Sequence, residues 1–191
     1  MSKLLRKLAG ADGAEIAEAA LVLPLVFMFL LGIVWFGRAF NVYATITQAA
    51  EQGAARAARP ACSTNCAPGC DWQDGNGNDT RFPCDASVED SVYAVMDASS
   101  LNRNQVMLYI PGGLQFCPFP VPPGGCSTTA NNLTVCRSVV LNPTEVSQTG
   151  APPQCGTIVS FQYPFQMNLP FTSLNLQQIV LKAQAQSRME N

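Results

Sequence analysis

The stretch GAEIAEAALVLPLVFMFLLG, residues 13–32, decides how this chain folds. It opens an apolar run in which no residue from Ala19 to Gly37 carries a charge. As a helix rising about 1.5 Å per residue, this run spans about 28 Å, close to the roughly 30 Å hydrocarbon core of a bilayer. The run therefore predicts a membrane-spanning helix. Two carboxylates, Glu15 and Glu18, stand at its edge. Because a charged side chain in hydrocarbon is costly, their position needs a physical reason.

The orientation of the span follows from the three basic residues that precede it, Lys3, Arg6 and Lys7. The positive-inside rule keeps this N-terminus in the cytoplasm and exports the remainder of the chain. A cleaved secretory signal and a plain uncleaved anchor are the alternatives. The apolar run is longer than the 7–15 residues of a signal peptide, and acidic residues separate it from the basic start, so a signal peptide fits less well.

Helix-forming sequence continues beyond the apolar run. Residues 38–58 contain no proline and are rich in alanine. Small residues recur there at every fourth position, in the two series Ala49, Gly53, Ala57 and Ala50, Ala54, Ala58. This spacing predicts stripes on one helix face that another helix or a sheet can approach closely. We expect one helix over about residues 15–58, roughly 65 Å long. Pro24 is expected to kink or loosen its first half.

These residues together resemble the TadE-like pseudopilins, which are minor pilins of tight-adherence (Flp-type) pilus systems. The resemblance lies in G-AEIAE-AALVLP, in the apolar run, and in GRAFNVYATITQAAEQGAARAAR. It covers about residues 10–59. It implies a short basic leader that ends in glycine and is cut by a prepilin peptidase, with a glutamate at the fifth position of the mature chain.

By this resemblance the leader ends at Gly13, Ala14 becomes the new N-terminus, and Glu18 is the fifth residue. A competing register cuts after Gly10 and makes Glu15 the fifth residue, but the spacing to Pro24 favours Gly13. The cut gives Glu18 a physical role. Its carboxylate lies at the positive end of the helix dipole. The α-amine of Ala14 is its ionic partner, either within the same chain or, as the resemblance implies, from a neighbouring subunit.

The fold class expected is α+β: a long N-terminal transmembrane and spine helix followed by a small, disulfide-rich, antiparallel-sheet domain of pilin-like type. The domain organisation expected is a leader over 1–13, the transmembrane and spine helix over 14–58, and a cysteine-rich periplasmic domain over 59–191. A Ser87–Asp90 capping box predicts a short helix over 87–99. The residue types predict strands over 105–110, 133–141 and 157–167, and partial alternation predicts a last strand over 179–189, which gives a sheet of three or four strands. A Pro/Gly-rich loop is expected over 110–126.

The chain has eight cysteines and no histidine. An even number of cysteines on the exported side of a membrane favours disulfides, whose 105 possible pairings stay open. A local Cys117–Cys126 bond around the Pro/Gly loop is one expectation. A zinc site is the competing interpretation, but there is no CxxC pair and no histidine ligand. The disulfide candidates are Cys62, Cys66, Cys70, Cys84, Cys117, Cys126, Cys136 and Cys155.

Other chemistries find little support in the sequence. Without histidine there is no Ser-His-Asp or Cys-His pair, and no GxxxxGK loop is present, so we expect no enzyme and no cofactor. Residues 74–85 superficially resemble a calcium loop, but Asp79 replaces the turn glycine and Asp85 replaces the final glutamate, so no metal site is assigned. A net charge of -2 without a basic stripe excludes nucleic acid as the expected partner.

The function expected is that of a structural and assembly component of a tight-adherence pilus, a pseudopilin or minor pilin processed after Gly13. Its expected partners are a prepilin peptidase, other pilins with the pilus assembly machinery, and inner-membrane lipid. The expected location is the bacterial inner membrane, crossed once, with the C-terminal domain in the periplasm, and the pilus itself is a further possible place for it. The alternative is a single-pass anchored binding module or adhesin, whose Pro/Gly loops present the binding surface.

Overall fold

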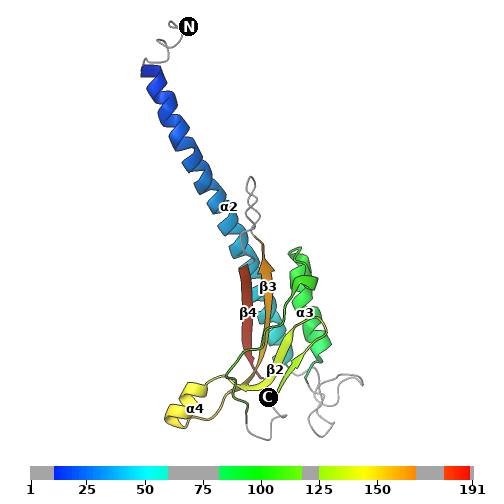
Figure 1. Cartoon of the computed structure of the whole chain (residues 1–191). Coiled ribbons are helices and arrows are strands. Elements are labelled where there is room, and N and C mark those ends of the chain that lie inside the picture. The colour runs from blue at the N-terminus through cyan, green and yellow to red at the C-terminus, as the bar shows by residue number, and fades with distance from the viewer. Residues whose placement is uncertain (1–10, 60–81, 118–124, 167–178, 190–191) are drawn as a thin grey trace. The chain divides into compact units, whose positions relative to one another are not determined.

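The computed structural model describes residues 11–59, 82–117, 125–166 and 179–189, with side chains described from Ile16 onward. The chain divides into two compact units between Asn41 and Val42. The helix α2, Ala11–Ala58, crosses this division, so its first part belongs to one unit and its last part to the other (Figure 1). A long N-terminal helix followed by a small antiparallel sheet confirms the expected fold class.

Helix α2 ends where its sequence changes. Ala58 is its last residue, and Arg59 and Pro60 follow. A residue before proline is disfavoured in the α conformation, which accounts for the stop. Arg56 lies in the last turn, where a cation meets the negative end of the helix dipole. Pro24 lies inside α2, which remains one helix on both sides of it, and the kink there stays a prediction.

The second unit is built on one four-stranded sheet in the order β1-β2-β3-β4, with every neighbouring pair antiparallel. The bounds are β1 Gly125–Thr128, β2 Thr134–Val140, β3 Cys155–Phe165 and β4 Ile179–Arg188. Between β2 and β3 the register shifts between Cys136 and Val139, where Ser138 adopts φ 56. This irregularity is a bulge in β2.

The core lies between one face of this sheet and two helices, the end of α2 and α3, Asp85–Ala98 (Figure 1). Both four-residue series of small side chains on α2 are buried, which confirms the predicted close-approach stripes. Gly53 marks the closest approach, because a Cβ atom there would lie 2.5 Å from Val92 Cγ2 and 3.3 Å from Val159 Cγ1. A small second cluster of Cys136, Val139 and Ile158 packs with Leu114 and Leu141.

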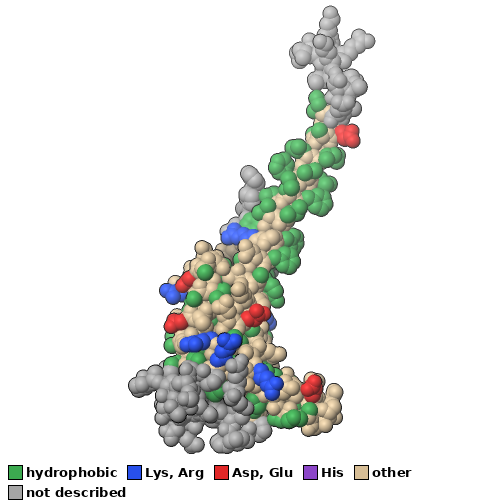
Figure 2. All heavy atoms as spheres, turned by 180° about the vertical axis from the view of Figure 1, so that it is seen from behind, with side chains coloured by type: hydrophobic (Ala, Val, Ile, Leu, Met, Phe, Trp, Pro, Cys, Tyr) green, Lys and Arg blue, Asp and Glu red, His purple; other side chains and the backbone are tan. Residues whose placement is uncertain are grey.

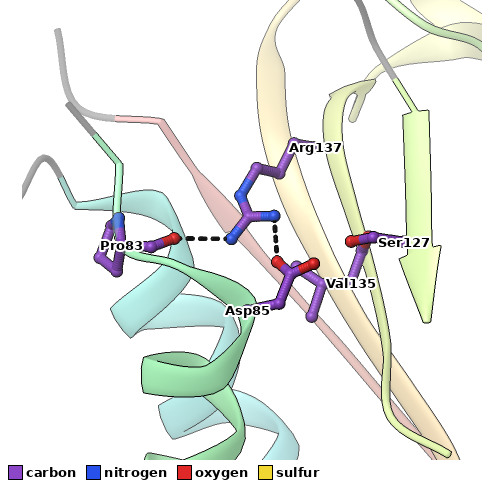
Figure 3. Close-up of polar contacts among 5 residues, drawn as sticks. All are labelled: Pro83, Asp85, Ser127, Val135 and Arg137. Carbon is purple, nitrogen blue, oxygen red and sulfur yellow. Dashed lines mark hydrogen bonds and ion pairs between the residues drawn. The ribbon is translucent and has the colours of Figure 1, made fainter. Parts of the chain in front are cut away.

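Helix α3 begins at Asp85, two residues before the expected start, and its N-cap Cys84 makes no side-chain capping bond. The Ser87–Asp90 capping box was therefore wrong. The start is held instead by Arg137, whose side chain is fully buried. Its guanidinium forms an ion pair with Asp85 and donates an Nη2 hydrogen bond of 2.8 Å to the carbonyl of Pro83. Figure 3 shows both contacts reaching from β2 to the chain that leads into α3.

Two further expectations about this unit need correction, and one helix was not expected. Residues 105–110 were expected to form a strand, but only the isolated bridge Met107↔Gln162 forms there, after a short 3-10 helix at Arg103–Gln105. The end of the loop expected over 110–126 is the start of β1. Helix α4, Pro143–Thr149, was not expected, and it begins with proline at its first position and ends at Gly150 in the left-handed conformation.

Candidate functional site

The N-terminal part of α2 presents an apolar surface that no described residue covers. Most of its large hydrophobic side chains from Ile16 to Phe40 are exposed, with 74% of Leu21 and 75% of Met28 accessible, while Leu31 and Trp35 are half-buried. Figure 2 shows hydrophobic side chains gathered along this part of the helix. By length and composition the segment is able to cross a membrane. Water does not favour such a surface, so lipid or other apolar helices are its natural surroundings.

One face of this segment is hollowed into an open apolar groove. Its lining residues follow the 3- and 4-residue spacing that brings side chains to one helix face. They are Leu25, Met28, Phe29, Gly32, Ile33 and Phe36. Gly32 has no side chain, and a Cβ added there would meet no atom within 4 Å. The groove therefore offers a notch between bulky side chains, the kind of surface into which a second helix packs closely.

Polar residues mark the two ends of the apolar segment. Glu18, at the N-terminal end, is exposed, and no residue that the structure describes forms an ion pair with it. At the other end the guanidinium of Arg38 lies 5.8 Å from the centre of the Trp35 ring. Tryptophan and arginine are suited to the boundary between lipid and water. The uncharged length between these ends, about 28 Å, matches one bilayer crossing.

The predicted processing residues lie at the start of this helix. Gly13 and Ala14 both lie within α2, and their side chains are not described. Glu18 is one helical turn from Ala14, on the same side of the helix, because residues four apart are neighbours on a helix surface. The backbone therefore places the Glu18 carboxylate within the first turn of a chain that would begin at Ala14.

The described cysteines form disulfides, but not the expected local one. Cys117 is bonded to Cys155 and Cys126 to Cys136, so the expected Cys117–Cys126 bond was wrong. The reason is sheet register, which sets Cys126 opposite Cys136 on neighbouring strands. Cys84 is also disulfide-bonded. The remaining candidates, Cys62, Cys66 and Cys70, lie outside the described residues.

Within the described ranges, no three His, Cys, Asp or Glu side chains come together as a metal site would require. The weighed calcium loop over 74–85 lies largely outside those ranges. The most buried charge in the described part is Arg137, which sequence reasoning did not single out. An arginine inside a strand gives no sequence sign of burial, since its Asp85 partner is 52 positions away.

Residues 13–55 match a family model described as TadE-like protein. No curated protein and no solved structure matches the chain. The matched segment begins at Gly13 and contains Glu18, Pro24, the apolar groove and the first small residues of the spine. Residues 13–55 are therefore similar to TadE-like proteins, which confirms the resemblance found in the sequence.

Proposed function

We propose that this chain is a pseudopilin or minor pilin that takes part in building a tight-adherence pilus. The observation that carries the proposal is the uncovered apolar groove on α2, set within a TadE-like segment. A helix of this kind has two successive environments, the inner membrane before assembly and a bundle of pilin helices afterwards. The exposed side chains of the groove suit both, because lipid tails and apolar helices are chemically alike.

In this proposal a prepilin peptidase removes residues 1–13, leaving 14–58 as the anchor and spine and 59–191 as the exported domain. The cut creates an α-ammonium on Ala14, close to the Glu18 carboxylate. A carboxylate in an apolar bundle requires a cationic partner, and the amine of the same chain or of a neighbouring subunit supplies it. The need for this pair fixes the axial position at which one helix packs against the next.

The basic residues Lys3, Arg6 and Lys7 place the leader on the cytoplasmic side, where the peptidase substrate is presented. The domain that follows α2 then lies in the periplasm. Disulfides support this location, because such bonds form and persist in oxidising compartments. Other pilins and the assembly machinery are the partners that the groove would meet.

The proposal is tested by site-specific photo-crosslinking in native membranes. A photoreactive phenylalanine analogue is placed at Phe29, which lines the groove, and separately at Phe27. These two positions are about 160° apart around the helix at 100° per residue, and they carry the same side chain at nearly the same depth. Phe27 is exposed and is absent from the groove lining, so it is the matched control.

We expect crosslinks from position 29 to the helix of another pilin-like protein, and at least fivefold fewer from position 27. Equal crosslinking from both positions would show a helix that only lipid surrounds. That result, or crosslinks to no pilin-like protein at all, would favour the anchored binding module and overturn the proposal.

A further inference from the structure

The Cys126–Cys136 disulfide, which joins β1 and β2, differs from the Cys117–Cys155 disulfide in its solvent exposure and its place in the sheet. Cys126 and Cys136 are directly opposite each other in the antiparallel ladder, and the bond joins the two strands. Cys126 is exposed, whereas Cys136 is fully buried. The strand that carries Cys126 has four residues and lies at the edge of the sheet. One half of this disulfide therefore faces solvent from a short edge strand.

The second disulfide offers an internal comparison. Cys117 is 7% exposed and Cys155 is half-buried, so both residues are less exposed than Cys126. The two bonds also close loops of different length, because their cysteines are 38 and 10 positions apart. A cross-link that closes a longer loop restricts the unfolded chain more and contributes more to folding. Cys117–Cys155 therefore has the features of a structural bond.

We propose that Cys126–Cys136 is a site of thiol–disulfide exchange, attacked at the Cys126 sulfur by the thiolate of a dithiol protein. The attack forms a mixed disulfide at Cys126 and breaks the bond to Cys136, whose sulfur leaves as a thiolate and takes up a proton. The second thiol of the dithiol protein then attacks the mixed disulfide. Cys126 is released as a thiol, and the two cysteines of the dithiol protein end joined in a disulfide. Two electrons pass from the dithiol protein to this chain.

Solvent access to the two cysteines decides which of their sulfurs is attacked. Exchange requires a thiolate to reach one sulfur of the bond, and its rate falls when that sulfur is buried. Cys136 is enclosed by the second apolar cluster, next to Val139 and Ile158. Cys126 stands on β1, and none of the strands that the structure describes lies on the outer side of β1. The sulfur of the exposed residue Cys126 is thus assigned as the point of attack, and that of the buried residue Cys136 as the leaving group.

Reduction at this site leaves the rest of the domain in place. The pairing of β2 with β3 and that of β3 with β4 do not involve β1, so these three strands stay paired. The main core also contains no residue of β1. Without the disulfide, β1 is held by its four-residue ladder and by the 3.2 Å hydrogen bond from Ser127 Oγ to the carbonyl of Val135 (Figure 3). The exchange therefore controls how firmly one edge of the sheet is fastened, and it is independent of the pilus role.

The test measures the reduction rate of each bond in the full-length, oxidised protein in detergent. Dithiothreitol is added, samples are quenched over time with N-ethylmaleimide, and the remaining bonds are then reduced and labelled with its heavy isotope form. After trypsin, Cys117, Cys126 and Cys136 lie in residues 104–137 and are told apart by fragment ions, while Cys155 lies in 138–182. Near-ultraviolet circular dichroism of the tyrosines reports whether the domain stays folded.

We expect Cys126 and Cys136 to be reduced at least ten times faster than Cys117 and Cys155, with the tyrosine signal retained. Equal rates, a faster reduction of Cys117–Cys155, or reduction only when the tyrosine signal collapses would each overturn the proposal.

Two matched variants test the point of attack. In Cys136→Ser the remaining thiol is Cys126, and in Cys126→Ser it is Cys136. With oxidised glutathione we expect Cys126 to form a mixed disulfide at least ten times faster than Cys136 does. Equal or reversed rates would contradict the assignment of Cys126. The rates measured on the wild-type bonds test the proposal even where a variant fails to fold.

Discussion

The substitution Gly53→Ala tests how closely α2 packs on the sheet domain. The added Cβ would lie 2.5 Å from Val92 Cγ2 and 3.3 Å from Val159 Cγ1, against about 3.5–4.0 Å for an ordinary carbon contact. Both valines are fully buried, and a β-branched side chain has little freedom to turn aside. Overpacking of this kind costs about 1–3 kcal/mol, and the better helix propensity of alanine returns about 1 kcal/mol. A 2.5 Å contact forces a shift of buried atoms, so we take the upper part of that range, about 2–3 kcal/mol, and expect a net loss of about 1–2 kcal/mol.

For a unit of this size such a loss lowers the melting temperature by about 3–6 °C. The assay is thermal unfolding of the full-length protein in detergent, followed by near-ultraviolet circular dichroism of the domain tyrosines, because detergent keeps the apolar part of α2 helical after the domain unfolds. Gly37→Ala is the matched control in the same helix, since nothing lies within 4 Å of its added Cβ.

The same assay is used for a double-mutant cycle of Gly53→Ala and Val92→Ala. Because Val92→Ala removes the side chain that the new Cβ meets, we expect Gly53→Ala to cost less in that background than in the wild type. A melting temperature for Gly53→Ala at or above that of Gly37→Ala would refute the close packing of α2 on α3 and β3.

Three further predictions concern single side chains. Asp85→Asn removes the carboxylate that pairs with the fully buried Arg137 guanidinium, so we expect the free energy of unfolding in denaturant to fall by about 3–5 kcal/mol, and an unchanged midpoint would contradict this pair. Burial, together with the nearby Glu89 carboxylate and against the opposing effect of Arg103, raises the pKa of Tyr93 from 10.0 to about 12. The neutral phenol of Tyr93 is therefore favoured over the phenolate in the folded state by about 2–3 kcal/mol, and this stabilisation is complete below pH 10 and is lost as the pH rises through 12. The free energy of unfolding of Tyr93→Phe should not show this loss. Parallel curves of unfolding free energy against pH for the two proteins would contradict the prediction. In recovered pilus fractions, Glu18→Gln should reduce the amount of this protein at least tenfold while Glu15→Gln leaves it within twofold, and equal recovery would remove the special role of Glu18.

The helix and its packing face were predictable because local sequence determines them. An uncharged run of bilayer length produces a helix in any context, and the four-residue spacing of Ala49, Gly53 and Ala57 identifies the face that packs closely. The strands β2, β3 and β4 were also expected within two residues of their ends, because alternating β-branched and polar residues indicate strands.

The remaining features depend on contacts between distant residues. The strand β1 is a short Gly-Cys-Ser-Thr segment beside a Pro/Gly-rich loop, and it becomes a strand only because β2 pairs with it. The disulfide pairing follows from that register. The start of α3 at Asp85 depends on Arg137, which lies on β2, 52 positions away in the sequence. None of these partners is adjacent in sequence, so propensity and spacing did not reveal them.

Removal of the leader is measured on the N-terminus of the protein in native membranes, by N-terminal sequencing and intact mass. We expect a chain that begins at Ala14, with Glu18 as its fifth residue. A start at Ala11 would contradict the role of Glu18 and transfer it to Glu15. An intact Met1 would remove the amine that the carboxylate needs, and a start near residue 60 would show that the apolar helix is only a signal peptide, so either result would contradict the account.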